Sequence, residues 1–158
     1  MKNKKFTLWH SLVGTAVLLV VEDILVHLFP APLGVWIILV VAIVGSVSTI
    51  YIATEVIEEV RSARHMLVLL SVIAMEFVLF FTFQYWFLLM VQPASFPALA
   101  SDPVSLLLGS TMVFVFNPIY TPATLAGRAL LLINTFSALG LVLFLLQNVW
   151  QIRSKKAE

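Results

Sequence analysis

Three acidic residues lie inside long apolar runs of the sequence, where an ionisable side chain needs a physical explanation. Glu22 and Asp23 lie in the run 8–28, and Glu76 lies in the run 66–91. An ionised carboxylate at the centre of a membrane helix costs about 2.5–3.5 kcal/mol on insertion scales. We therefore expect these membrane-buried acids to face the protein interior, to pair or to stay protonated, with His27 as the local partner of Asp23.

The acids could serve three kinds of chemistry. As neutral acids they could hold helices together by hydrogen bonds, or they could carry protons or cations through a helix bundle. Asp23 and His27, spaced i and i+4, could also contribute to a metal site. Because further ligands are missing and Glu76 lies much deeper, we predict no metal site. Burial disfavours a charged carboxyl, so we expect Glu76 to be protonated at neutral pH.

The segment 110–128, STMVFVFNPIYTPATLAGR, is apolar but too short to span a bilayer and is interrupted by Pro118 and Pro122. Its backbone polar groups must be hidden in protein or against a water-filled cavity. Asp102-Pro103 favours the start of a short helix over 104–112, followed by an extended or irregular stretch over 113–118. The pattern predicts a re-entrant pore loop; the alternative is an amphipathic loop on the membrane surface.

From Thr111 the chain reads TMVFVFNP, and Pro122, Thr124 and Gly127-Arg128 follow. This pattern resembles the pore region of the potassium channel superfamily, which reads TMTTVGYGD, then a proline, a threonine and Gly-Arg before the inner helix. The resemblance covers roughly residues 102–150. It implies a homotetramer around a central axis, through which inorganic ions could pass.

The filter-equivalent residues are Val115, Phe116, Asn117 and Pro118. Val115 matches the family's valine, but Phe116 and Pro118 replace its two glycines, and Asn117 replaces its tyrosine. Those glycines allow backbone conformations in which carbonyl groups face the pore and replace the ion's hydration shell. We therefore expect a cation-channel-type pore that is not selective for potassium. A pore ringed by Phe114 or Phe116, or a scaffold that does not conduct, are the other outcomes.

A partly polar stripe follows the last apolar run. Asn134, Leu141 and Asn148 recur every seven residues, and Ser137 lies beside Asn134. The resemblance implies that these four residues line the pore. The same stripe suits a hydrogen-bonding seam between helices equally well, because Asn and Ser commonly join membrane helices.

The elements that must position these residues are membrane helices. Of 158 residues, 61% are hydrophobic and 11% charged, with a mean hydropathy of +1.07. Each of four apolar runs has the ~20 residues that cross ~30 Å of hydrocarbon. The sequence predicts an all-α integral membrane protein with four transmembrane helices and the re-entrant loop between the third and fourth. The apolar runs are 8–28, 34–54, 66–91 and 125–150.

We divide the chain into an N-terminal hairpin with its linker, 1–65, and a pore-like module, 66–158. Small residues at four-residue spacing in the second run favour close helix packing; they are Ala42, Gly45, Ser46, Thr49 and Ala53.

Several function classes have no support in the sequence. The chain has no cysteine, and it lacks a phosphate-binding glycine loop, G-x-S-x-G and H-E-x-x-H. No basic patch suggests nucleic-acid binding. We therefore expect no enzyme, no cofactor and no nucleic-acid partner; the expected partners are the lipid bilayer, further copies of the chain and inorganic ions. The alternative function is a non-conducting bundle that binds a partner or ligand, or moves protons or cations, through its buried acids.

Basic residues are segregated along the chain. Eight of the nine fall on one side if both termini are cytoplasmic, and Arg128 alone falls on the other; the eight are Lys2, Lys4, Lys5, Arg61, Arg64, Arg153, Lys155 and Lys156. We expect a prokaryotic-type inner or plasma membrane with the linker 92–124 outside.

We predict that cysteines introduced as Asn3→Cys and Ala157→Cys are protected from a membrane-impermeant thiol reagent added outside. The native chain has no cysteine, so each variant reports one position. External labelling of either position would reverse the predicted orientation.

Overall fold

The computed structural model describes residues 4–58 and 63–154, and the side chains of residues 9–55 and 65–147. Over this part of the chain all regular structure is helical, as the sequence predicts. Five α-helices and one short 3-10 turn follow in order: α1 Lys4–Leu28, α2 Ala31–Glu58, α3 Ala63–Val91, η1 Pro93–Ser95, α4 Pro103–Phe114 and α5 Leu125–Ser154.

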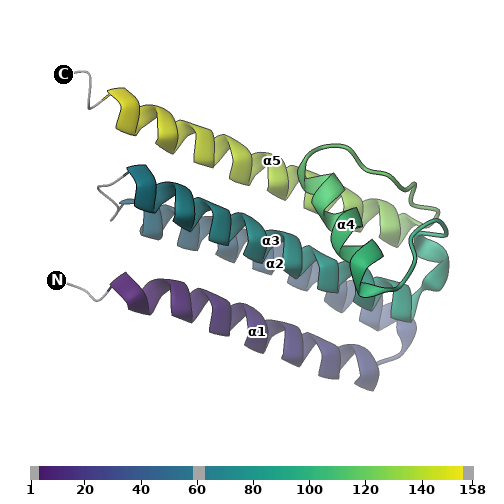
Figure 1. The fold of residues 1–158 in the computed structure, drawn as a ribbon. Helices are drawn as coiled ribbons and strands as arrows, with labels where there is room; N and C mark the ends of the chain where they lie inside the picture. The colour runs from purple at the N-terminus through teal and green to yellow at the C-terminus, as the bar shows by residue number, and fades with distance from the viewer. Residues whose placement is uncertain (1–3, 59–62, 155–158) are drawn as a thin grey trace.

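Four helices form an up-and-down bundle, shown in Figure 1. The first residues of α1 and the last residues of α5 lie at one end, which we call the terminal end. The connection between α3 and α5, which contains α4, lies at the opposite loop end. Each of the four is long and apolar enough to cross a membrane, which confirms the predicted number; the spans are Trp9–Leu28, Ala31–Glu55, His65–Val91 and Leu125–Gln147.

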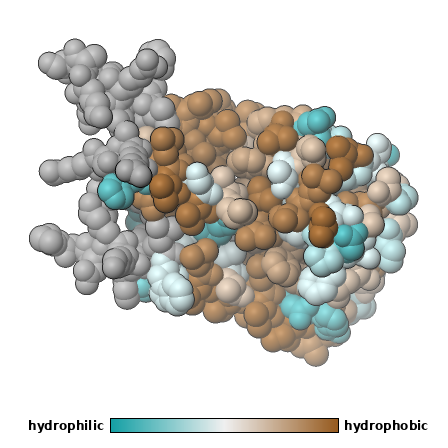
Figure 2. Space-filling view, viewed as in Figure 1, coloured by the Kyte–Doolittle hydropathy of each residue, from teal (hydrophilic) through white to brown (hydrophobic). Residues whose placement is uncertain are grey.

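The bundle's outer surface is apolar. Figure 2 shows hydrophobic residues over most of the visible side, with hydrophilic residues gathered toward the loop end. Exposed aliphatic residues such as Val17 and Val20 cover the outside of α1, and Trp9 and Trp36 are also exposed near helix starts. A continuous apolar surface of this kind indicates contact with lipid rather than with water.

The small residues of α2 lie at close helix contacts, as the sequence predicts, and Gly45 makes its contact with α3. Ala42, Ser46, Thr49 and Ala53 are all buried. At Gly45 an added Cβ would run into the ring of Phe80, so only glycine leaves room for this ring.

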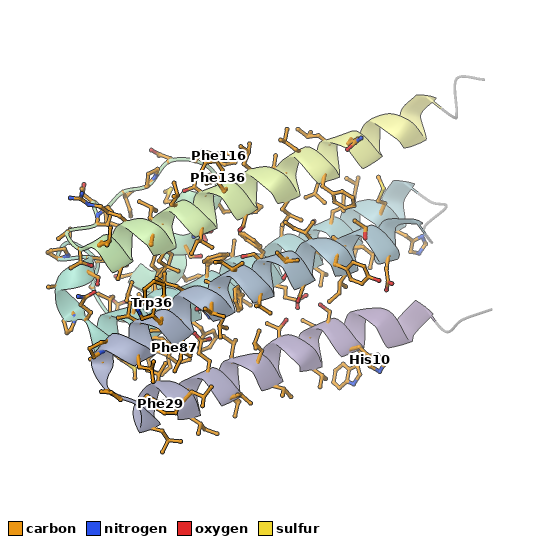
Figure 3. All side chains as sticks on the ribbon, turned by 180° about the vertical axis from the view of Figure 1, so that it is seen from behind. His10, Phe29, Trp36, Phe87, Phe116 and Phe136 are labelled. Atoms are coloured by element: carbon orange, nitrogen blue, oxygen red, sulfur yellow. The ribbon has the colours of Figure 1, made fainter. Side chains whose placement is uncertain are left out.

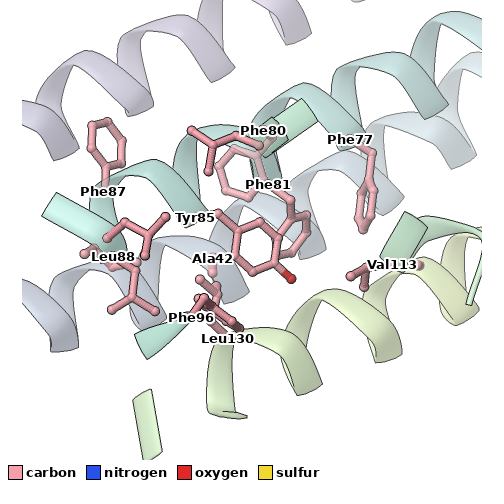
Figure 4. Close-up of a cluster of buried hydrophobic side chains, with 14 of the residues drawn as sticks. Ala42, Phe77, Phe80, Phe81, Tyr85, Phe87, Leu88, Phe96, Val113 and Leu130 are labelled. Carbon is pink, nitrogen blue, oxygen red and sulfur yellow. The ribbon is translucent and has the colours of Figure 1, made fainter. Parts of the chain in front are cut away.

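Aromatic side chains from α3 fill the centre of the bundle (Figure 4). Phe77, Phe80 and Phe81 are buried, and the Phe77 and Phe81 ring centroids lie 4.9 Å apart. Ile38 and Ala42 of α2 belong to the same buried cluster. The hairpin and the pore-like module that we distinguish in the sequence therefore share one hydrophobic core, and α2 packs on α3 and α5 as well as on α1.

The loop end is tied together by a polar cluster around Thr124, the residue before α5. Its hydroxyl lies 3.0 Å from Ser95 Oγ and 3.2 Å from Gln92 Oε1, and it accepts from the Gly127 N–H at 3.2 Å. The Ala123 N–H donates to the Ser95 carbonyl at 2.9 Å. Thr124 thus caps α5 and joins its start to η1.

Gly127 allows this junction to close, and this gives a prediction. A Cβ at Gly127 would lie 2.8 Å from the Ser95 carbonyl oxygen, a backbone atom that cannot move aside easily. We expect Gly127→Ala to lower the free energy of unfolding by about 1–3 kcal/mol, the usual cost of overpacking. The measurement is thermal unfolding in detergent.

Gly14→Ala is the matched control, because a Cβ there has nothing within 4 Å. It should leave stability unchanged or raise it, since alanine favours helix more than glycine does. Equal behaviour of the two variants would contradict the predicted clash.

Candidate functional site

The short helix α4 begins where the sequence predicts. Asp102 Oδ1 accepts hydrogen bonds from the backbone N–H groups of Val104 and Ser105 at 3.1 and 3.0 Å, and Pro103 occupies the first helical position. The hydrogen bonds from Ser105 lower the pKa of the Asp102 carboxyl. Asp102 is therefore an ionised cap at the positive end of the helix dipole.

The end of α4 differs from the prediction. We expected the helix to stop at Met112 and the chain to be extended or irregular from Val113, but α4 continues through Phe114. The Phe116 N–H donates to the Val113 carbonyl at 2.9 Å, and the Asn117 N–H donates to the Met112 carbonyl at 2.8 Å. This pair of bonds is the Schellman motif, which closes a helix through one residue in the left-handed conformation.

Phe116 is that left-handed residue, with φ of 60°. Glycine is usual at this position, and a residue with a Cβ costs roughly 1–2 kcal/mol there. We expected phenylalanine to be unable to replace the family's glycine in an unusual backbone conformation. In this structure Phe116 does adopt positive φ, and it does so as a helix cap.

α4 packs against the middle of α3. Ser110 Oγ donates to the Val78 carbonyl at 2.9 Å, and the rings of Phe114 and Phe77 lie 5.7 Å apart. Val78 is 13 residues from each end of the span His65–Val91. At ~1.5 Å per residue this is about 20 Å from either end. The last turn of α4 is therefore level with the centre of this apolar span.

The filter-equivalent residues lie on the surface of the chain. Val115 is 55% exposed and Phe116 45%, and Asn117 and Pro118 are also exposed. Figure 3 shows Phe116 at the edge of the bundle, on the same side as Phe136 of α5. Phe114, by contrast, is partly buried against Phe77, so of the two phenylalanines considered for a constriction only Phe116 projects from the chain.

Two residues of the stripe on α5, Asn134 and Leu141, face the protein interior. Asn134 is completely buried and its Nδ2 donates to the Tyr85 hydroxyl at 3.0 Å, while Leu141 is also completely buried. Ser137 is half-buried, and the side chain of Asn148 lies outside the described residues. Asn134 and Leu141 therefore form a seam with neighbouring helices of this chain, which favours the alternative of a helix seam at these two positions; the pore-lining assignment of the stripe stays a prediction. The exposed face of α5 is apolar and includes Leu132, Phe136, Leu139, Leu143 and Leu146.

Tyr120 anchors the segment that returns from α4 to α5, and no motif in the sequence points to this role. Its ring centroid lies 5.6 Å from that of Tyr85 and 5.1 Å from that of Phe96. Gly109 makes room for it, because a Cβ there would lie 2.6 Å from the Tyr120 ring. Burial raises the pKa of the Tyr120 hydroxyl, and the nearby Tyr85 adds to this rise, so the group stays neutral.

Glu76 lies in the interface between α3 and α1 and is 5% exposed. Both donors that contact it come from α1: Ser11 Oγ donates to Glu76 Oε1 at 2.8 Å and Thr15 Oγ1 donates to the same oxygen at 2.7 Å. The four-residue spacing of Ser11 and Thr15 places both hydroxyls on one helix face. We had predicted the burial of Glu76 but not these partners.

Glu22 is the second acid at this interface and is completely buried. Gln84 Nε2 donates to Glu22 Oε2 at 2.7 Å. Ser11, Thr15 and Glu22 share a face of α1, and this spacing is the signal in the sequence that could have identified them as one seam.

Asp23 has a different environment from Glu22 and Glu76. Its Oδ1 lies 3.4 Å from His27 Nδ1, so the two expected partners are in contact, but their side chains are 45% and 60% exposed. Asp23 therefore lies on the outside of α1 and not in the bundle interior. Among the residues that the structure describes, no group of three or more His, Cys, Asp or Glu side chains could hold a metal ion.

A groove of about 650 Å³ opens between α2 and the start of α5. Trp36, Val91 and Leu125 contribute apolar walls, and Gln92 contributes a polar group. It contains none of the filter-equivalent, stripe or acidic residues, so the groove is separate from the sites discussed above.

Comparison of the chain with protein-family models, with curated proteins and with solved structures finds no match.

The left-handed Phe116 gives a prediction about stability. Phe116→Gly removes the steric cost of positive φ, and the chain loses little packing because the side chain is 45% exposed. After the greater backbone entropy of glycine is allowed for, we expect unfolding free energy to rise by about 1 kcal/mol. The measurement is thermal unfolding in detergent.

Val115→Gly is the control for this substitution, because Val115 has φ of −91° and gains nothing from glycine. It should lower stability. A Phe116→Gly variant less stable than the native chain would show that contacts of the ring outweigh the backbone strain.

Proposed function

We propose that the chain is one subunit of a homotetrameric pore-loop membrane protein whose cation pathway is not selective for potassium. The observation that carries this proposal is the depth of α4. The bond from Ser110 to Val78 fixes the end of α4 at the centre of the span formed by α3.

The chain after α4 supports assembly into an oligomer. Residues 115–119 are exposed, and residues 117–119 have no regular secondary structure. These residues begin level with the middle of α3, and the chain returns to the loop end at Ala123, which bonds to Ser95. Irregular backbone at membrane depth is tolerated only where it is covered by protein or lines water. One subunit does not cover this segment, so neighbouring copies or an aqueous pathway must do so.

The direction of α4 favours a cation. Its N-terminus, with Asp102, lies toward the loop end, and its C-terminus lies at mid-depth. A helix C-terminus carries roughly −0.5 elementary charge, which is weakly screened away from water. Four such helices pointing at one axis would make its centre favourable for a positive ion.

Selectivity for potassium is not expected from the residues at the filter-equivalent positions. The conformation of Phe116 is used to end α4, and Pro118 has a fixed φ and no N–H. Neither residue supplies the consecutive inward-facing carbonyl groups that replace the hydration shell of potassium.

The exposed face of α5 suggests how conduction would be controlled. If α5 borders the axis, Leu132, Phe136 and Leu139 present only hydrocarbon to it. A narrow apolar passage loses its water and blocks ions without any movement of a plug. A pathway of this kind is closed until the helices move apart.

A non-conducting scaffold is the second candidate. It is favoured by the burial of Asn134 and Leu141, because the most polar side of α5 is used within the subunit.

Water access to Phe116 tests the proposed pore. In the cysteine-free chain, Phe116→Cys should react with a water-soluble thiol reagent in reconstituted vesicles, because thiolate forms only where water reaches the sulfur. Val17→Cys is the control: it is 57% exposed on α1 near the middle of a span and should face lipid. Equal protection of both positions would mean that Phe116 also faces lipid or protein.

Assembly and flux give the second test. We expect fourfold symmetry in particle images and a potassium-to-sodium permeability ratio near one in a vesicle flux assay. A monomer in the bilayer would rule out the pore. If the tetramer shows no flux, Phe116→Ser should be tested, because serine replaces the exposed apolar side chain by a small polar one. Absence of flux in this variant as well would favour the scaffold.

A further inference from the structure

Two oxygen atoms of the Glu22–Gln84 pair lack a hydrogen-bond donor. Both residues are completely buried between α1 and α3. Gln84 Nε2 donates to Glu22 Oε2 at 2.7 Å, but Glu22 Oε1 and Gln84 Oε1 are buried without a partner. A buried polar group left unpaired destabilises the fold, so this interface requires an additional donor.

A proton on Glu22 is the simplest donor. A protonated carboxyl has one O–H to donate, and the amide oxygen of Gln84 is an acceptor on the side chain that already contacts Glu22. An acid and a primary amide can then form a ring of two hydrogen bonds, one from the amide N–H and one from the acid O–H. The ionised acid would place two acceptor oxygens together with no hydrogen between them.

The surrounding charges also favour the neutral acid. No lysine or arginine occurs between residues 6 and 60 or between residues 65 and 127. On α1, Asp23 is the next residue and opposes a second negative charge, while His27 lies beside Asp23 on the exposed side. α2, which packs on both α1 and α3, has no ionisable residue from 31 to 50. On α3, Glu76 is eight residues from Gln84, about 12 Å along the helix.

We propose that Glu22 and Gln84 form an intramembrane proton-binding site that links the docking of α1 on α3 to protonation. When the proton is bound, the acid–amide pair is complete and joins the two helices. When it leaves, the two acceptor oxygens repel each other, and the pair has to rotate apart or admit water. The proposal does not depend on the pore, because Glu22 and Gln84 take no part in α4 or in the segment that follows it.

Infrared spectroscopy of the full chain in lipid nanodiscs tests the site directly. The carbonyl stretch of a protonated carboxylic acid is separate from the amide bands, and ¹³C-labelled glutamate shifts it. At pH 7 we expect such a band in the native chain. Glu22→Gln should remove the Glu22 component, which is read from the difference between the two spectra so that any contribution of Glu76 cancels. Asp23→Asn is the matched control, one residue away on the exposed side of α1, and should keep the band.

Gln84→Leu tests the pairing and does not require the Glu22 variant to fold. We expect it to keep the acid band but to shift its position, since the amide no longer bonds to the acid. An unshifted band in this variant, no glutamate-derived acid band in the native chain at pH 7, or an unchanged band in Glu22→Gln would each overturn the proposal.

The same measurement separates a proton from a metal cation. Replacing sodium by N-methylglucamine at pH 7 should leave the band unchanged if the site holds a proton. Growth of the band after sodium is removed would show that Glu22 binds sodium as a carboxylate, and the proton site would then be rejected.

Discussion

The apolar environment of the four spans is the constraint on which the rest of this structure depends. Every backbone and side-chain polar group that lies in the apolar spans has to find its partner within the protein. Hydroxyl groups solve this locally by donating to the carbonyl one turn earlier, as Ser46 does to Ala42 at 2.6 Å and Thr82 does to Val78 at 2.8 Å. Longer polar side chains cannot do so, and their bonds to other helices fix the arrangement of the bundle.

α3 makes most of these connections. Glu76 and Gln84 bond to α1, Tyr85 accepts from Asn134 of α5, and the carbonyl of Val78 accepts from Ser110 of α4. Apolar contacts between membrane helices have little preference for one register, since lipid tails offer similar contacts. Because each hydrogen bond needs a particular pair of atoms, the polar contacts of α3 define the rotation and depth of the three helices around it.

The parts of the structure that follow from composition and local chemistry could be predicted. Four apolar runs predicted four spans, Asp102-Pro103 predicted the start of α4, and the small residues of α2 predicted its close packing against a neighbouring helix. Features that depend on tertiary contacts could not be predicted from the sequence. The stripe through Asn134 suits a water-facing surface and a seam between helices equally well. At Asn134 the bond to Tyr85 favours the seam. A phenylalanine in the left-handed conformation contradicts the local preference, so the end of α4 was placed two residues too early.

The cluster that joins Thr124 and Gly127 to η1 has a mechanical consequence. It fixes α5 at the loop end, whereas the other end of this 30-residue helix carries the C-terminus. If the contacts of α5 with α2 and α3 loosen, the helix tilts about this end, and its displacement grows with distance from the pivot. At ~1.5 Å per residue, α5 is a lever about 45 Å long. A small change of angle at Gly127 therefore moves Ser154 at the terminal end about three times as far as it moves Phe136, which lies on the same side as Phe116.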